Sequence, residues 1–84
     1  MTEINAKIWQ QDDEYHIDVR GLLPPQPFVQ VIKLLESEQI KDTVVIHHDR
    51  EPVYLFPELL ERHWNYEVKH NGDEFIIRLT RSQD

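Results

Sequence analysis

The side chains of this sequence that are best suited to chemistry are histidines and carboxylates. His47, His48 and Asp49 are consecutive, and His70 lies further along the chain. Imidazole nitrogens and carboxylate oxygens bind zinc, iron and copper, and an imidazole can also serve as an axial ligand of haem iron. The chain contains no cysteine, so disulfides and thiolate metal sites are excluded. Any metal site must therefore use His, Asp or Glu.

The strands predicted around these residues decide which of them can meet. Residues 43–47 are a short β-branched run that is typical of a buried parallel strand. Because side chains alternate across a strand, His47 and His48 point to opposite faces and cannot chelate one ion together. His48 and His70 each lie at the carboxyl end of a predicted strand, where α/β proteins tend to bind ligands. We therefore take His48, His70 and Asp49 as candidate metal ligands; the alternative is that both histidines are hydrogen-bonded strand ends without a ligand.

Alternating apolar and polar residues predict two strands at the start of the chain. Residues 4–9 and 15–20 both alternate, and the polar residues between them form the connecting turn. We expect the first run to be an added edge strand, with a loose tail as the alternative because chain ends are ordered only when paired. The sequence leaves open whether residues 4–9 pair within the chain or between two chains.

Two helices are predicted, and prolines stand at the beginning of each. After Gly21 breaks the strand, the prolines at 24, 25 and 27 lead into an apolar set at helical spacing, Phe28, Val31, Ile32 and Leu35. Prolines are tolerated in a first helical turn because its N–H groups have no partner within the helix. The second helix is predicted from about Pro57 to Arg62, after an irregular or 3₁₀ turn.

A β-hairpin is predicted at the end of the chain. Asn71-Gly72 suits the two-residue loop of a type I′ turn between two alternating runs. Counting outward from this loop pairs His70 with Asp73, Lys69 with Glu74, Val68 with Phe75, Tyr66 with Ile77 and Trp64 with Leu79. In this register apolar residues face apolar residues, and charged residues face residues of opposite charge.

These elements predict an α/β (α+β) fold. Their order is β-α-β-α-β-β, with the extra strand at the front, and right-handed crossovers place both helices on one face of a mixed sheet. The result is a two-layer sandwich. No linker, repeat or low-complexity stretch interrupts residues 1–84, so we expect a single domain with its core in residues 14–81 and an extra strand or tail in residues 1–13.

One motif at the junction of strand and helix resembles a known family. Residues 17–27, Ile-Asp-Val-Arg-Gly-Leu-Leu-Pro-Pro-Gln-Pro, are similar to the signature of the TusA/SirA-like sulfur-carrier family, in which an Asp and a Gly-Leu pair precede Cys-Pro-X-Pro. Asp18, Gly21, Leu22 and the Pro25-Gln26-Pro27 run match this signature in order. Pro24 stands where the family has its cysteine.

The resemblance implies the family's fold but not its reaction. Persulfide chemistry needs a thiolate at the start of the helix, and Pro24 cannot supply one. The chain is similar to a cysteine-free branch of the family, whose members are described only as domains of unknown function. We therefore expect no sulfurtransferase and, more generally, no enzyme; catalysis by His48 with Asp49 is the least favoured reading.

The same end of the sheet supplies a predicted binding surface. Prolines fix the start of the first helix and present an apolar knob of Leu23, Pro24 and Pro25, and His47, His48, Asp49 and Arg50 lie at the neighbouring strand end. We expect a non-enzymatic protein-interaction or regulatory module that binds a protein partner through this surface. The alternative is a small metal- or haem-binding protein that uses its histidines, although we expect no resident cofactor.

Composition excludes several other partners. The 84 residues carry a formal charge of −7, which opposes binding to the phosphates of nucleic acids or of acidic membranes. Nothing resembles a signal peptide, and no run of 18 apolar residues occurs. We expect a cytoplasmic protein, monomeric or weakly homodimeric, that contacts neither nucleic acid nor membrane.

Overall fold

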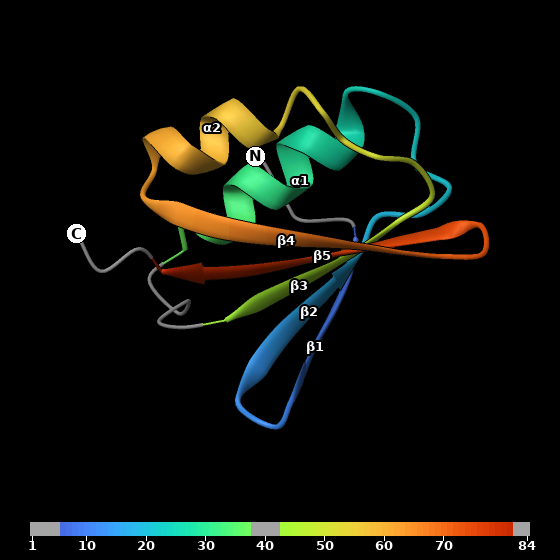
Figure 1. The fold of residues 1–84 in the computed structure, drawn as a ribbon. Coiled ribbons are helices and arrows are strands. Elements are labelled where there is room, and N and C mark those ends of the chain that lie inside the picture. Colours follow the sequence, from blue (N-terminus) through green and yellow to red (C-terminus); the bar gives the residue numbers. More distant parts are fainter. Residues whose placement is uncertain (1–5, 38–42, 82–84) are drawn as a thin grey trace.

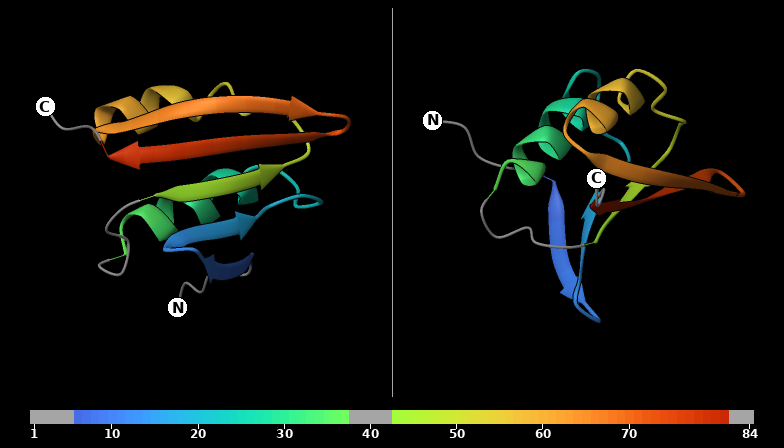
Figure 2. Two further views of the ribbon diagram at one scale, coloured as in Figure 1. Left: turned by 60° about the horizontal axis from the view of Figure 1, so that its bottom comes forward. Right: turned by 60° about the vertical axis from the view of Figure 1, so that its left-hand side comes forward.

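The computed structural model describes residues 6–37 and 43–81 and has the predicted order of elements. They are β1 (Lys7–Gln11), β2 (Glu14–Asp18), α1 (Gln26–Leu35), β3 (Val44–His48), α2 (Phe56–Glu61), β4 (Trp64–Asn71) and β5 (Glu74–Arg81). The strands form one sheet in the order β1-β2-β3-β5-β4, in which only β2 and β3 are parallel. Both helices cover one face of this sheet (Figure 1), so the predicted two-layer α+β sandwich is confirmed. The sheet twists strongly, and the β1–β2 hairpin is rotated away from the β4–β5 hairpin (Figure 2).

The first strand pairs within the chain. It begins at Lys7 and is antiparallel to β2, with Ile8 opposite Ile17. Asp12 and Asp13 form the two-residue loop, and both have a positive φ, 53° and 66°, as a type I′ turn requires. This turn places the strand slightly later than the predicted residues 4–9, of which residues 4 and 5 lie outside the described range.

The register predicted for the last hairpin is wrong by two residues. Asn71 pairs with Glu74, so the loop is Gly72-Asp73 and not Asn71-Gly72. Gly72 has a φ of +64° and occupies the first central position, which a type II′ turn reserves for glycine. His70 therefore lies opposite Phe75, not Asp73. Since the shift is an even number of residues, every side chain keeps its predicted face.

Prolines begin both helices, as the sequence predicts. Pro25 is the N-cap of α1, and Pro27 lies in its first turn. In α2, Leu55 is the N-cap and Pro57 lies in the first turn, after a turn in which the N–H of Leu55 donates to the carbonyl of Pro52. No helix in the described parts of the chain is long and apolar enough to cross a membrane.

The core lies between the helices and the sheet. Its buried side chains are Ile17, Val19, Val44, Ile46, Ile77 and Leu79 from or beside the strands, Val31, Leu34, Leu35, Leu55 and Leu59 from or beside the helices, and Trp64 at the start of β4. No helix of the described residues covers the opposite face of the sheet, which carries mostly polar residues. We call this opposite face of the sheet the open face.

Candidate functional site

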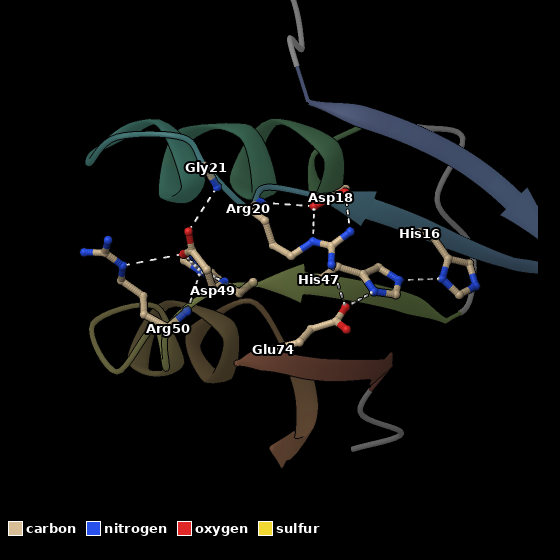
Figure 3. Close-up of polar contacts among 9 residues, drawn as sticks. His16, Asp18, Arg20, Gly21, His47, Asp49, Arg50 and Glu74 are labelled. Atoms are coloured by element: carbon tan, nitrogen blue, oxygen red, sulfur yellow. Dashed lines mark hydrogen bonds and ion pairs between the residues drawn. The ribbon is translucent and has the colours of Figure 1, made fainter. Parts of the chain in front are cut away.

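Two loops meet where β2 and β3 end. Residues 19–25 lead from β2 to α1 and residues 49–55 lead from β3 to α2, and the loops run side by side in both figures (Figures 1 and 2). Asp49 joins them, because its Oδ2 accepts a hydrogen bond of 3.0 Å from the N–H of Gly21 (Figure 3). Gly21 has a φ of +83°, a conformation that costs a side-chain-bearing residue more than glycine. This bond lowers the pKa of Asp49 below its ordinary value.

An ion-pair network borders the first loop. Nε and Nη2 of Arg20 each donate to a carboxylate oxygen of Asp18 over 2.9 Å, a bidentate pair that lowers the pKa of Asp18. Nη1 of Arg20 also lies 3.5 Å from Oε2 of Glu74 on β5. The network therefore links the end of β2 to β5, across β3.

His48 is a buried structural residue at the end of β3. Its side chain is 1% exposed, and Nδ1 accepts the N–H groups of Asp49 and Arg50 at 3.0 and 3.3 Å. An acceptor at Nδ1 places the ring proton on Nε2, which is buried and has no hydrogen-bond partner among the described residues. Burial lowers the pKa of His48, and the neighbouring Asp49 opposes this shift only in part. The neutral ring thus caps the turn that follows β3.

A hydrogen-bonded chain of imidazoles crosses the open face. His47 Nδ1 donates to Oε2 of Glu74 at 2.9 Å, so its Nε2 accepts the Nδ1–H of His16 at 3.0 Å (Figure 3). Trp9 stacks on both rings, with centroids 5.1 Å from His16 and 5.3 Å from His47. Burial, followed by repulsion from His47, lowers the pKa of His16; Glu14 nearby partly opposes this. The hydrogen bonds link β2, β3 and β5, and the stacking of Trp9 adds β1.

The structure brings only two of the three predicted metal ligands together: Nδ1 of His48 lies 3.2 Å from Oδ1 of Asp49, whereas His70 is on another strand. His48 on β3 and His70 on β4 are both in register with Phe75 on β5, the strand that lies between β3 and β4. His70 is exposed and stacks on Phe75 with a centroid distance of 4.1 Å, whereas the carboxylate of Asp49 lies between His48 and Gly21. Within residues 6–37 and 43–81, no three side chains of His, Asp or Glu are grouped to hold a metal ion. His47 and His48 point to opposite faces, as predicted.

Five of the seven residues predicted to form a binding surface are exposed. Leu23, Pro24, Pro25, Asp49 and Arg50 are exposed, but His48 is buried and His47 belongs to the open face.

Two neighbours of this surface were not predicted. Val53 is 61% exposed and Tyr54 is 47% exposed, and the ring of Tyr54 packs against Phe28 of α1 at 5.9 Å. The apolar run between Pro52 and Pro57 was the available signal, but its sequence does not distinguish the exposed Val53 and Tyr54 from the buried Leu55.

His16 and Glu74 were also missed as partners of His47. They lie far from His47 in the sequence, and no local pattern pairs them with it. The strand order places β2 and β5 on either side of β3, and this brings the three residues together.

The fold defines a SirA-like α/β scaffold. The crystal structure of a SirA-like protein from Desulfitobacterium hafniense matches with a TM-score of 0.67, over 81% of this chain and 97% of that chain, at 15% sequence identity. More particularly, residues 16–81 match the family described as "Uncharacterized conserved protein (DUF2249)", and the chain belongs to that family. No curated protein matches it significantly. The resemblance of residues 17–27 is thus confirmed for fold and family.

Proposed function

We propose that the chain is a protein-binding module. Its binding surface, which we call the docking edge, consists of Leu23, Pro24, Pro25, Asp49, Arg50, Val53 and Tyr54. The observation that carries this proposal is the exposure of three large apolar side chains on two adjoining loops: 77% for Leu23, 61% for Val53 and 47% for Tyr54. Neighbouring exposed apolar side chains rimmed by charged groups are typical of protein interaction sites.

The docking edge is held in place before any partner arrives. Asp49 ties the loops together through Gly21, His48 caps the second loop, and Tyr54 rests on Phe28. Loops that are already ordered lose little conformational entropy on binding, so more of the contact energy contributes to affinity.

Charge decides which partners the docking edge favours. The formal charge of −7 attracts basic proteins over a distance and repels acidic ones. Asp49 and Glu51 are exposed beside the apolar side chains and can pair with Lys or Arg. The partner that fits is a protein segment with an apolar anchor next to basic residues.

A displayed library of random peptides, selected on the immobilised protein, tests this function. We expect enriched peptides to combine apolar with basic residues. Leu23→Asp and Tyr54→Asp should weaken their binding about 10-fold or more, because they place charge where apolar anchors are desolvated. Leu60→Asp is the matched control, since Leu60 is 56% exposed at the other end of α2 and should leave affinity within about 2-fold. Peptides that bind all three variants as well as the natural chain would exclude the docking edge.

Metal binding is a second candidate function, and the open face favours it more than the predicted ligands do. Nδ1 of His16 and Nε2 of His47 face each other at 3.0 Å, and a carboxylate of Glu74 holds the outer nitrogen of His47, as is common behind metal-bound imidazoles. In a calorimetric titration with zinc and copper(II) salts, we expect His16→Asn and His47→Asn to abolish binding and His70→Asn to leave it unchanged. A titration with haemin tests the haem alternative. Binding that survives the loss of both His16 and His47 would rule out this site.

A further inference from the structure

The strand β4 forms one margin of the sheet. It is eight residues long and pairs with β5 along one side only, and among the described residues no strand lies against its other side (Figure 2). An edge strand of this kind presents a row of unpaired N–H and C=O groups that can pair with another strand.

The closing hairpin shows which backbone groups face outward. Residues that flank a two-residue hairpin loop exchange both of their backbone hydrogen bonds, so Asn71 bonds inward to Glu74. Inward and outward residues alternate along an antiparallel strand. The N–H and C=O groups of Tyr66, Val68 and His70 therefore point outward.

The sequence of β4 is complementary to itself. If a second copy pairs antiparallel with a two-fold axis through Val68, Val68 faces its own counterpart and Tyr66 faces the partner's His70. In the same register Glu67 faces the partner's Lys69, and symmetry repeats this opposite-charge pair. In this register the outward N–H and C=O groups of Tyr66, Val68 and His70 lie opposite those of the second copy, so they can form the hydrogen bonds of an antiparallel pair. Centring the axis on Glu67 or on Lys69 would instead oppose like charges.

Glu67 and Lys69 are available for these contacts. Both are exposed, and neither forms a salt bridge within the described residues. Glu67 lies opposite Arg78 in the sheet, but Arg78 is engaged with Glu14. In the proposed register, Glu67 and Lys69 occupy non-hydrogen-bonded positions, where facing side chains approach most closely.

Apolar surface continues from β4 onto α2. Phe56 stacks on Tyr66 with a centroid distance of 4.3 Å. Leu60 follows Phe56 by one helical turn, so the two share a side of α2, and Leu60 is 56% exposed. The two-fold axis would bring the α2 helices of two copies to the same face of the extended sheet, with Leu60 beside the joint.

We propose that this chain forms a symmetric homodimer in which two β4 strands join their sheets into one, with Val68 on the two-fold axis. One strand pair with a small apolar flank buries less surface than a permanent dimer, so association is weak and depends on concentration. The interface is separate from the docking edge, and each proposal can fail without the other.

Charge reversal tests the register. Sedimentation of the natural chain over a range of concentrations should show a monomer–dimer equilibrium. Glu67→Lys and Lys69→Glu should each raise the dissociation constant about 10-fold or more, because each places like charges opposite each other twice. An equimolar mixture of the two variants should form a heterodimer at least as readily as the natural chain, since both charge pairs are then restored.

Glu51→Lys is the control for Glu67→Lys, because it makes the same change in net charge at an exposed residue outside β4. It should leave the dissociation constant within about 3-fold. A natural chain that stays monomeric at millimolar concentration would overturn the proposal. So would a dimer that tolerates both reversals, or single variants that do not combine when mixed.

Discussion

His48→Ala is expected to lower the free energy of unfolding by about 2–4 kcal/mol, whereas His48→Asn should lower it by less than half as much. The alanine variant leaves a cavity at a side chain that is 1% exposed and removes the acceptor for two backbone N–H groups of the turn. Asparagine keeps an acceptor, because its side-chain oxygen bonds backbone N–H groups just ahead of it in the chain. The substitution by asparagine also removes Nε2 of His48, which is buried and has no hydrogen-bond partner among the described residues.

Urea unfolding at pH 7.5 measures these differences. His70→Ala is the control, because His70 is exposed and should change stability by no more than about 0.5 kcal/mol. Equal losses in the alanine and asparagine variants of His48 would mean that packing alone, and not capping of the turn, explains its contribution. A pull-down with His48→Ala would therefore test the turn and not a surface contact, which is why the docking test uses Leu23 and Tyr54.

Acid is expected to destabilise the fold from near neutral pH. The pKa values of His16 and His48 are both lowered from about 6.5, in each case mainly by burial. Below pH 6.5 the unfolded chain therefore binds more protons than the folded chain, and stability falls as the pH falls, by up to about 1.4 kcal/mol per pH unit for each extra proton. A second loss begins below about pH 3.8, because the pKa values of Asp18 and Asp49 are also lowered.

Urea midpoints between pH 8 and pH 5 check this prediction. The natural chain should lose stability below about pH 6.5, and His48→Asn should lose less, since one of the two imidazoles no longer titrates. Stability that rises toward pH 5 would contradict the assignment of His16 and His48 as neutral groups in the folded state.

The hairpin of β4 and β5 shows which features the local sequence predicts and which it does not. Alternation identified both strands and the face of every side chain, because the period of two is independent of the turn. Either Asn71-Gly72 or Gly72-Asp73 could form a two-residue loop, and the alternating pattern alone is compatible with both. The structure has the second, with glycine at the position that a type II′ turn requires.

The candidate site shows a different limit. Local spacing correctly separated His47 from His48 and located the exposed Leu23 and the neighbouring prolines. It could not foresee that His48 would face the turn, since that depends on where the chain goes after β3. Nor could it place Val53 and Tyr54 on the surface, because exposure is decided by what packs beside them.

The sequence by itself determined the element order, the layered fold, the family and the absence of a thiol at Pro24. Each of these follows from short-range periodicity, from a contiguous motif or from composition. Only the tertiary structure decided the partners across the sheet. His16, His47 and Glu74 meet because β2, β3 and β5 are adjacent, and Asp49 reaches Gly21 because two loops leave parallel strands at the same edge. Strand order is set by how the whole core packs, and no local pattern in the chain encodes it.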